Sequence, residues 1–216
     1  MTVEPGKISK IALVAIGLVV VGLVLVNLYS GMRKLQQAAE RKREMASTLE
    51  HLERPVPVFS LTDQNGKTLD NTDLLGKVWA ASFIFTHCQG PCPTITKHMA
   101  ELQKEVADLP DVRLVSLTID PARDTPEVLK EYSARFHADG QRWFFLTGPE
   151  DVLKKVVQEG FLTAQQPAPD SDQIIHGTRV ALVDRRGMIR GFLSGTDADL
   201  ASRAAARLRE LHREKP

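Results

Sequence analysis

The sequence predicts an α/β fold in which helices cover a mainly parallel sheet, and two patterns carry this prediction. First, residues 78–85 are a continuous apolar run, as expected of a strand that is buried on both faces, and residues 112–119 are expected to form a second buried strand. Second, segments with apolar residues at every third or fourth position, a spacing typical of helices, alternate with these strands. Strands and helices that alternate along the chain form α/β folds rather than all-α or all-β folds.

The composition bounds what the protein can be. The chain has 216 residues, enough for one domain of roughly 150 residues and an appendage. Its hydrophobic content of 43% and charged content of 25% are ordinary for a globular protein. A net charge of +1 argues against nucleic acid as the main partner, because phosphate binding needs a clear basic excess.

The N-terminal region predicts a membrane anchor. After a tail of residues 1–10, residues 11–29 carry no charge and are apolar except for Asn27. A helix of this length spans roughly 28 Å, close to the hydrocarbon core of roughly 30 Å. No convincing cleavage site follows it, so we expect a single uncleaved transmembrane helix. The Lys and Arg count is higher after this helix than before it, which by itself places the following domain in the cytoplasm.

Residues 30–54 are expected to form a helical stalk or linker. Apolar residues recur at helical spacing in this region, although a solvated tether would fit the pattern equally well. Pro55 and Pro57 end it and mark the start of the globular domain, 55–216.

Within this domain the expected order is hairpin, βαβαβα, hairpin and helix. Asn65-Gly66 predicts the first hairpin, between residues 58–61 and 67–69. The further elements expected are strand 78–85, a helix through 95–106, strand 112–119, a helix capped by Thr125, strand 143–146, helix 150–158, a hairpin of 180–183 and 188–192, and a last helix capped by Asp197. This order is a thioredoxin-like layout with an N-terminal hairpin and an extra strand–helix insertion.

Cys88 and Cys92 are the only cysteines of the chain and form a Cys-x-x-x-Cys pair. A close, isolated pair indicates redox chemistry or metal binding rather than a structural framework. Pro93 places Cys92 at a helix N-terminus, where the partial positive charge is expected to favour the thiolate. Thiolates attack disulfides and bind soft ions such as Cu(I) and Zn(II). Because two sulfurs leave a metal site incomplete, a third ligand is expected.

Two of the six histidines are candidates for that ligand. His176 follows the polar loop 165–173 and is expected to face the cysteines, although a structural, hydrogen-bonded histidine is the default from the residues alone. His87 adjoins Cys88 and competes as a ligand or as an electrostatic activator. The remaining histidines are expected on the surface or at a helix end: His51, His98, His137 and His212.

Asp120 and Asp124 lie where the second long strand ends. Helix capping and turn formation are the roles that we favour for them. The alternative is partner docking or support of the site.

Taken together, these motifs show that the chain resembles the Sco/SenC (PrrC-like) family over residues 56–208. The matching segments are Asn65-Gly66-Lys67, Leu74-Leu75-Gly76-Lys77, Phe85-Thr86-x-Cys88-x-x-x-Cys92-Pro93, Asp120-Pro121-x-x-Asp124-Thr125-Pro126, and His176 before a hairpin strand.

The resemblance implies a thioredoxin-like fold, a single anchor, and copper held by Cys88, Cys92 and His176, as Cu(I) with Cu(II) as a further state. It implies a role in assembling the copper centre of a haem–copper respiratory oxidase, by delivering copper or by reducing cysteines. The implied partners are the copper-accepting oxidase subunit and other periplasmic copper chaperones or thiol reductants. It also implies that the domain lies on the periplasmic side of the inner membrane, against the charge count.

The chain departs from the family pattern between its cysteines. Family members usually carry proline and an acidic residue after the first cysteine, whereas this chain has Gln89, Gly90 and Pro91. Gly177-Thr178 after the histidine is also a looser match. These changes alter the loop but remove no ligand.

Three other functions stay open at this point, and with them whether the protein is an enzyme. A general thiol–disulfide oxidoreductase usually has one residue fewer between its cysteines. A peroxiredoxin would need Thr or Ser where Gln89 stands. A redox or copper sensor that signals through the anchor would share every feature of the site.

Overall fold

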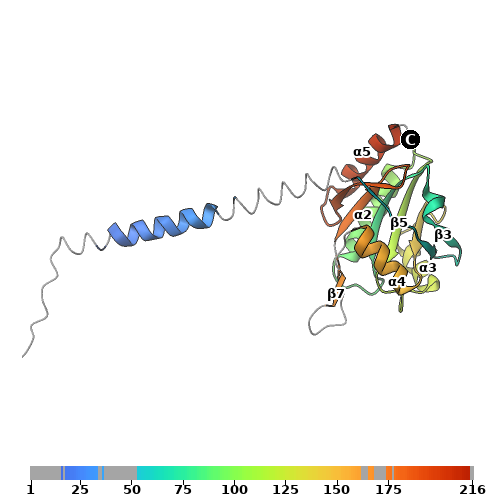
Figure 1. Ribbon diagram of the computed structural model, residues 1–216, viewed down its shortest axis with the longest axis horizontal. Coiled ribbons are helices and arrows are strands. Elements are labelled where there is room, and N and C mark those ends of the chain that lie inside the picture. The colour runs from blue at the N-terminus through green and yellow to red at the C-terminus, as the bar shows by residue number, and fades with distance from the viewer. Residues whose placement is uncertain are drawn as a thin grey trace, which may run out of the picture. The chain divides into compact units, whose positions relative to one another are not determined.

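The computed structural model describes residues 16, 18–33, 36, 53–161, 165–167, 174–176 and 178–214, with only the backbone described for 165–167 and 174–176. The chain divides into two compact units, Met1–Thr48 and Leu49–Pro216. In the first unit, residues 18–33 form the blue helix of Figure 1. None of the helices in the described ranges is both long enough and apolar enough to cross a membrane. Residues 11–15 and 17 of the predicted anchor lie outside those ranges.

The second unit is built on a six-stranded sheet with the order β1-β10-β9-β4-β5-β6. The strands β4, β5 and β6 are parallel, and β9, β10 and β1 add antiparallel pairs at the other side. Their bounds are β1 Arg54–Pro55, β4 Val78–Ile84, β5 Val112–Thr118, β6 Trp143–Leu146, β9 Arg179–Val183 and β10 Met188–Ser194. This is the α/β arrangement that the sequence predicts.

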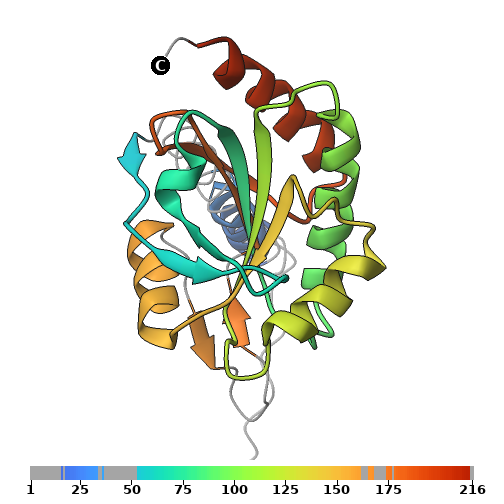
Figure 2. The same cartoon turned by 90° about the vertical axis from the view of Figure 1, so that its right-hand side faces the viewer.

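Helices cover both faces of this sheet. Figure 2 shows α2, α3 and α5 on one face and α4 on the other. The helices are α2 Cys92–Glu105, α3 Pro126–Arg135, α4 Glu150–Lys154 and α5 Leu200–Arg213, with a 3-10 turn, η1 Asn71–Leu74, and a π-helical turn, η2 Lys155–Gly160. Because both faces are covered, every residue of β4 is buried.

The buried centre of the sheet contains polar groups that pair with one another. The hydroxyls of Ser82 on β4 and Ser116 on β5 lie 2.8 Å apart. Trp143 on β6 donates its indole N–H to the Ser116 hydroxyl at 3.0 Å. Each of these three buried groups therefore has a hydrogen-bond partner inside the sheet, which offsets the cost of burying it.

Both predicted hairpins and the predicted cap of α3 are confirmed. The strands β2 Ser60–Thr62 and β3 Thr68–Asp70 pair around Gly66, whose φ is +76°. The strands β9 and β10 turn at Gly187, whose φ is +74°. Glycine adopts this left-handed conformation without the penalty of a Cβ. The Thr125 hydroxyl accepts a hydrogen bond from the Val128 amide at 3.4 Å.

Three local predictions differ from the structure. The final helix is not capped by Asp197: its N-cap residue is Asp199, while the Asp197 carbonyl accepts a turn hydrogen bond from Leu200. The helix predicted over residues 150–158 continues as the π-helical turn η2. The segment predicted as a polar loop contains a hairpin, β7 Gln165–Pro167 with β8 Ile174–His176.

Candidate metal centre

The two cysteines lie where β4 gives way to α2. β4 ends at Ile84, and Cys92 is the first residue of α2, with Pro93 in the first turn. Both cysteines are free thiols; Cys88 is half-buried and Cys92 is fully buried. The predicted position at the carboxyl end of a central strand is therefore confirmed, and one of the two sulfurs is accessible from solvent.

The thiols contact each other across the Gly90-Pro91 turn. A hydrogen bond joins the side chains of Cys88 and Cys92. The Gly90 amide lies 3.4 Å from Cys88 Sγ and donates to it. The loop thus brings both sulfurs within reach of one ion while a backbone donor supports the outer sulfur.

The environment of Cys92 opposes the predicted thiolate. Burial raises the pKa of the Cys92 thiol well above its usual range, and the hydrogen bond with Cys88 raises it further. A backbone hydrogen bond from Phe85 lowers it by less. The prediction that the helix N-terminus favours a Cys92 thiolate is wrong for the metal-free protein, because burial is the largest influence on the pKa of this thiol and raises it. A cation that binds both sulfurs must displace this proton.

A buried hydroxyl network supports the start of α2. The Thr96 hydroxyl donates to the Cys92 carbonyl at 2.9 Å and lies 3.0 Å from the Tyr132 hydroxyl. Burial raises the pKa of Tyr132 to about 12, so this phenol stays neutral and can share its proton in the network. The Cys92 carbonyl is therefore linked to α3 through the hydroxyls of Thr96 and Tyr132.

Asp124 ties together the two strand ends beneath the cysteines. Its fully buried carboxylate accepts hydrogen bonds from the Thr86 amide at 3.2 Å, the Thr86 hydroxyl at 2.6 Å and the Thr118 hydroxyl at 2.5 Å. Thr86 follows β4 and begins the cysteine loop, and Thr118 ends β5. The predicted turn is confirmed by the Asp124 amide, which donates to the Asp120 carbonyl, but the carboxylate caps no helix.

His87 faces Asp120. Its Nε2 lies 3.2 Å from an Asp120 carboxylate oxygen, which Arg123 also contacts at 2.7 Å. Its ring packs edge-on against Phe85, with centroids 5.2 Å apart. Nε2, one of the two ring nitrogens that can bind a metal, is therefore engaged with a carboxylate.

His98 is predicted to lie on the surface, and this prediction is wrong. His98 is only 9% exposed, and its Nδ1 lies 2.9 Å from the Gly195 carbonyl. His212 is likewise half-buried rather than exposed, with its Nδ1 2.9 Å from Arg185. His137 follows the end of α3 as predicted, with a φ of 53°. His51 lies outside the described residues.

The backbone of His176 belongs to β8 and pairs with Gln165 of β7. Its side chain lies outside the described part of the structure, so its role as the third ligand stays a prediction. Over the described ranges, no three His, Cys, Asp or Glu side chains are grouped as a metal site.

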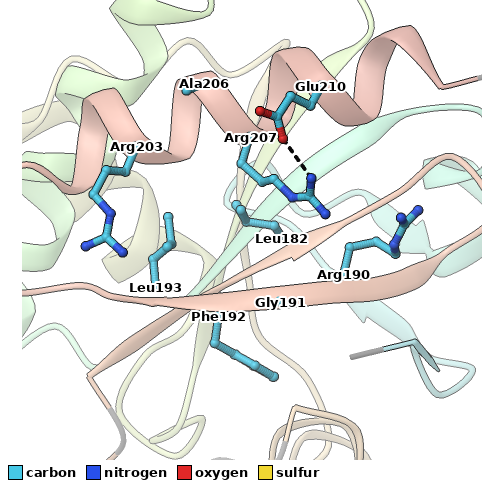
Figure 3. Close-up of a pocket in the computed structure, with 9 residues that line it drawn as sticks. All are labelled: Leu182, Arg190, Gly191, Phe192, Leu193, Arg203, Ala206, Arg207 and Glu210. Carbon is cyan, nitrogen blue, oxygen red and sulfur yellow. Dashed lines mark hydrogen bonds and ion pairs between the residues drawn. The ribbon is translucent and has the colours of Figure 1, made fainter. Parts of the chain in front are cut away.

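A separate cavity of about 320 Å³ lies between β10 and α5 (Figure 3). Its lining includes Leu182, Leu193, Arg203 and Arg207, and Arg207 pairs with Glu210 at 2.7 Å. No cysteine or histidine is among the described residues that line it. This cavity does not have the ligands of a soft-metal site.

A family model described as SCO1/SenC matches residues 47–213. The chain belongs to the SCO1/SenC family. It is 34% identical over 144 residues to the SCO1 protein homolog of Bacillus subtilis, a match that covers 66% of this chain and 75% of that protein. In two further curated relatives, the part that matches this chain covers 64% and 44% of the relative's own length.

Solved structures agree with this assignment. The structure of BsSco, described as a member of the Sco family of cytochrome c oxidase assembly proteins, is 32% identical, with a TM-score of 0.68 over 76% of this chain and 97% of that chain. The structure of Bradyrhizobium japonicum ScoI with copper bound is 28% identical, with a TM-score of 0.62 over 73% and 99%. The predicted Sco/SenC resemblance and thioredoxin-like fold are confirmed.

Proposed function

We propose that this SCO1/SenC protein binds copper through Cys88, Cys92 and His176 and serves assembly of the copper centre of a haem–copper respiratory oxidase. The observation that carries the proposal is the contact between two free thiols, one half-buried and one buried, at the start of α2. The copper-bound ScoI relative supports the choice of metal, and the description of BsSco supports the choice of process.

The ligand types suit a soft ion that must be passed on. Thiolates and an imidazole favour Cu(I), and Cu(II) is a second state of the same site. Binding releases the thiol protons, including the proton that burial keeps on Cys92. The half-buried Cys88 leaves one sulfur open to an acceptor. Copper is therefore the cargo of this protein rather than its resident cofactor.

The same two sulfurs couple copper binding to redox state. Joining them in a disulfide removes two electrons and two protons and leaves no thiolate for copper. The BsSco structure is described as containing a disulfide switch, which supports this coupling. Thiol–disulfide exchange with a periplasmic reductant or with the oxidase subunit would thus control loading.

We further propose that residues 11–29 anchor the chain in the inner membrane, that residues 30–54 form a stalk, and that the domain 55–216 lies in the periplasm. The uncharged apolar run supports the anchor. In intact spheroplasts, a membrane-impermeant maleimide should label Cys88 to the same extent as in lysed cells. Labelling that appears only after lysis would contradict a periplasmic domain.

Deletion of the gene tests the cellular role. Oxidase activity should fall in the deletion strain, and added copper should restore it, because excess copper bypasses a delivery protein. A variant lacking Cys88 should behave as the deletion strain does. Oxidase activity that is intact without the gene would contradict the proposal and favour a sensor.

A further inference from the structure

Gly195 joins the chain segment that follows His176 to the helix that begins with Cys92. The Gly195 amide donates to the Thr178 carbonyl at 2.6 Å. The Gly195 carbonyl lies 2.9 Å from Nδ1 of His98 on α2. Thr178 is two residues beyond His176, and His98 is six residues beyond Cys92. Two consecutive hydrogen bonds, through Gly195, therefore connect the backbone near His176 to the helix that carries Cys92.

The junction is close-packed and admits no side chain at position 195. A Cβ on Gly195 would lie 2.5 Å from the Thr178 carbonyl oxygen and 3.0 Å from Cγ1 of Ile95. Ile95 also belongs to α2, so this helix meets Gly195 through both an apolar contact and a hydrogen bond. Glycine is required at this position by the approach of backbone to backbone.

The chemistry of the contact defines the state of His98. A carbonyl oxygen can only accept, so Nδ1 must be the protonated, donating nitrogen of the ring. The ring is 9% exposed, so water competes little for this hydrogen bond. Within α2, the six-residue separation places His98 about 9 Å along the axis from Cys92. A rigid helix therefore links the hydrogen bond to the cysteine.

We propose that His98 and Gly195 are positioning residues that set where His176 meets the two sulfurs. The inference rests on the proposed copper site. His98 holds Gly195, Gly195 holds the Thr178 carbonyl, and Thr178 fixes the chain where it enters β9. Without these hydrogen bonds, the loop of Cys88 and Cys92 is unchanged. The His176 imidazole, however, is no longer held in position relative to the two sulfurs.

A double-mutant cycle on the reduced full chain tests this role. Cu(I) affinity is measured by competition with a colorimetric Cu(I) chelator for His98→Ala and Gly195→Ala, each with His176 present and with His176→Ala. With His176 present, both changes should weaken binding by about 10-fold to 100-fold, as for residues that orient a metal ligand. In the His176→Ala background their effect should vanish, because the group that they position is gone.

Two controls separate positioning from folding. His98→Asn, whose amide can place a donor near the position of Nδ1, should recover most of the affinity. His212→Ala removes a half-buried histidine that is hydrogen-bonded to Arg185, and should leave copper affinity unchanged. The reduction potential of the cysteine pair, which does not involve His176, should stay at the wild-type value in His98→Ala.

The outcomes distinguish this inference from the function on which it rests. Equal weakening of Cu(I) binding by His98→Ala in both backgrounds would overturn the positioning role, as would wild-type affinity in His98→Ala and Gly195→Ala. In either case a wild-type protein that still binds more tightly than His176→Ala would leave the copper site standing. A wild-type protein and His176→Ala with equal affinity would overturn both.

Discussion

Cys92 and Cys88 are four residues apart, yet only Cys88 is open to solvent. Burial also raises the pKa of the Cys92 thiol, so at pH 8 Cys92 contributes little thiolate. Alkylation follows both access and thiolate content. In the metal-free reduced protein, we expect iodoacetamide to label Cys88 at least about 10-fold faster than Cys92. Peptide mass spectrometry of a time course would measure this, and equal rates would contradict the described environment.

Asp184 gives the stability of the β9–β10 turn a pH dependence. Burial acts to raise the pKa of its carboxyl, but hydrogen bonds from Met188, Arg190 and Arg186 together hold it below its usual range. Because the folded-state pKa is depressed, the carboxylate stabilises the fold above the unfolded pKa of about 3.9. That contribution is lost as the pH falls through the folded-state pKa.

Asp184→Asn should therefore lower the free energy of unfolding by about 1–3 kcal/mol at pH 7. The difference from wild type should shrink as the pH falls below about 4, because the carboxyl is protonated first in the unfolded chain and then, at its depressed pKa, in the folded protein. Urea unfolding followed by circular dichroism at pH 7 and pH 3 would measure it. A difference that is larger at pH 3 than at pH 7 would show that the sign is wrong.

Single polar residues are also where sequence reasoning is weakest. Neither the burial of His98 nor the partners of Asp124 can be predicted from local pattern, because Gly195 and Thr86 are distant in sequence. The Cys92 thiolate prediction uses the helix N-terminus alone, and it lacks the desolvation that dominates in the folded chain.

Among the elements, the ends of β4 and β5 depend on one carboxylate. Asp124→Ala would leave the half-buried Thr86 amide and hydroxyl and the buried Thr118 hydroxyl without their acceptor. The expected loss is about 3 kcal/mol in the free energy of unfolding, since unpaired buried donors keep their desolvation cost. Urea denaturation would measure it. Glu131→Ala, which removes an exposed carboxylate within α3, should change stability by less than about 0.5 kcal/mol.

The end of η2 packs against the start of the domain at Gly160. A Cβ there would lie 2.5 Å from Cδ of Pro57, whose ring cannot rotate away. Gly160→Ala should therefore destabilise by about 1–3 kcal/mol, despite the higher helix propensity of alanine. Gly140→Ala, with no atom nearer than 3.8 Å, is the matched control and should change stability by less than about 0.5 kcal/mol. Equal melting temperatures for the two variants would refute the close contact.

Strong local signals predict the elements well. The apolar run of β4, the Asn65-Gly66 turn and the Thr125-Pro126 helix start all lie where the sequence indicates. The sequence does not separate an α-helix from the π-helical turn η2, because its apolar residues fit either winding over so few residues. It also does not predict β7 and β8, because β7 is Gln-Gln-Pro and the two isoleucines of β8 are too short a run to indicate a strand.

At the scale of the whole molecule, the parallel order β4-β5-β6 explains why the cysteines form a site. The carboxyl ends of these strands meet at one edge, which gathers the cysteine loop, Asp120 and Asp124 from separate parts of the chain. The alternating pattern predicts this gathering. Under the proposed function, copper is the ion that this dithiol binds, and the copper-bound ScoI relative supports that choice.

The copper content and coordination of the reduced full chain test the central claim most directly. After anaerobic loading with Cu(I), the wild-type protein should hold a single copper ion, and X-ray absorption should show two sulfur ligands and one nitrogen ligand. His176→Ala should lose the nitrogen ligand and bind more weakly, and Cys88→Ser should lose stoichiometric binding. A wild-type protein without stoichiometric copper, or a His176→Ala variant with an unchanged spectrum, would contradict the account.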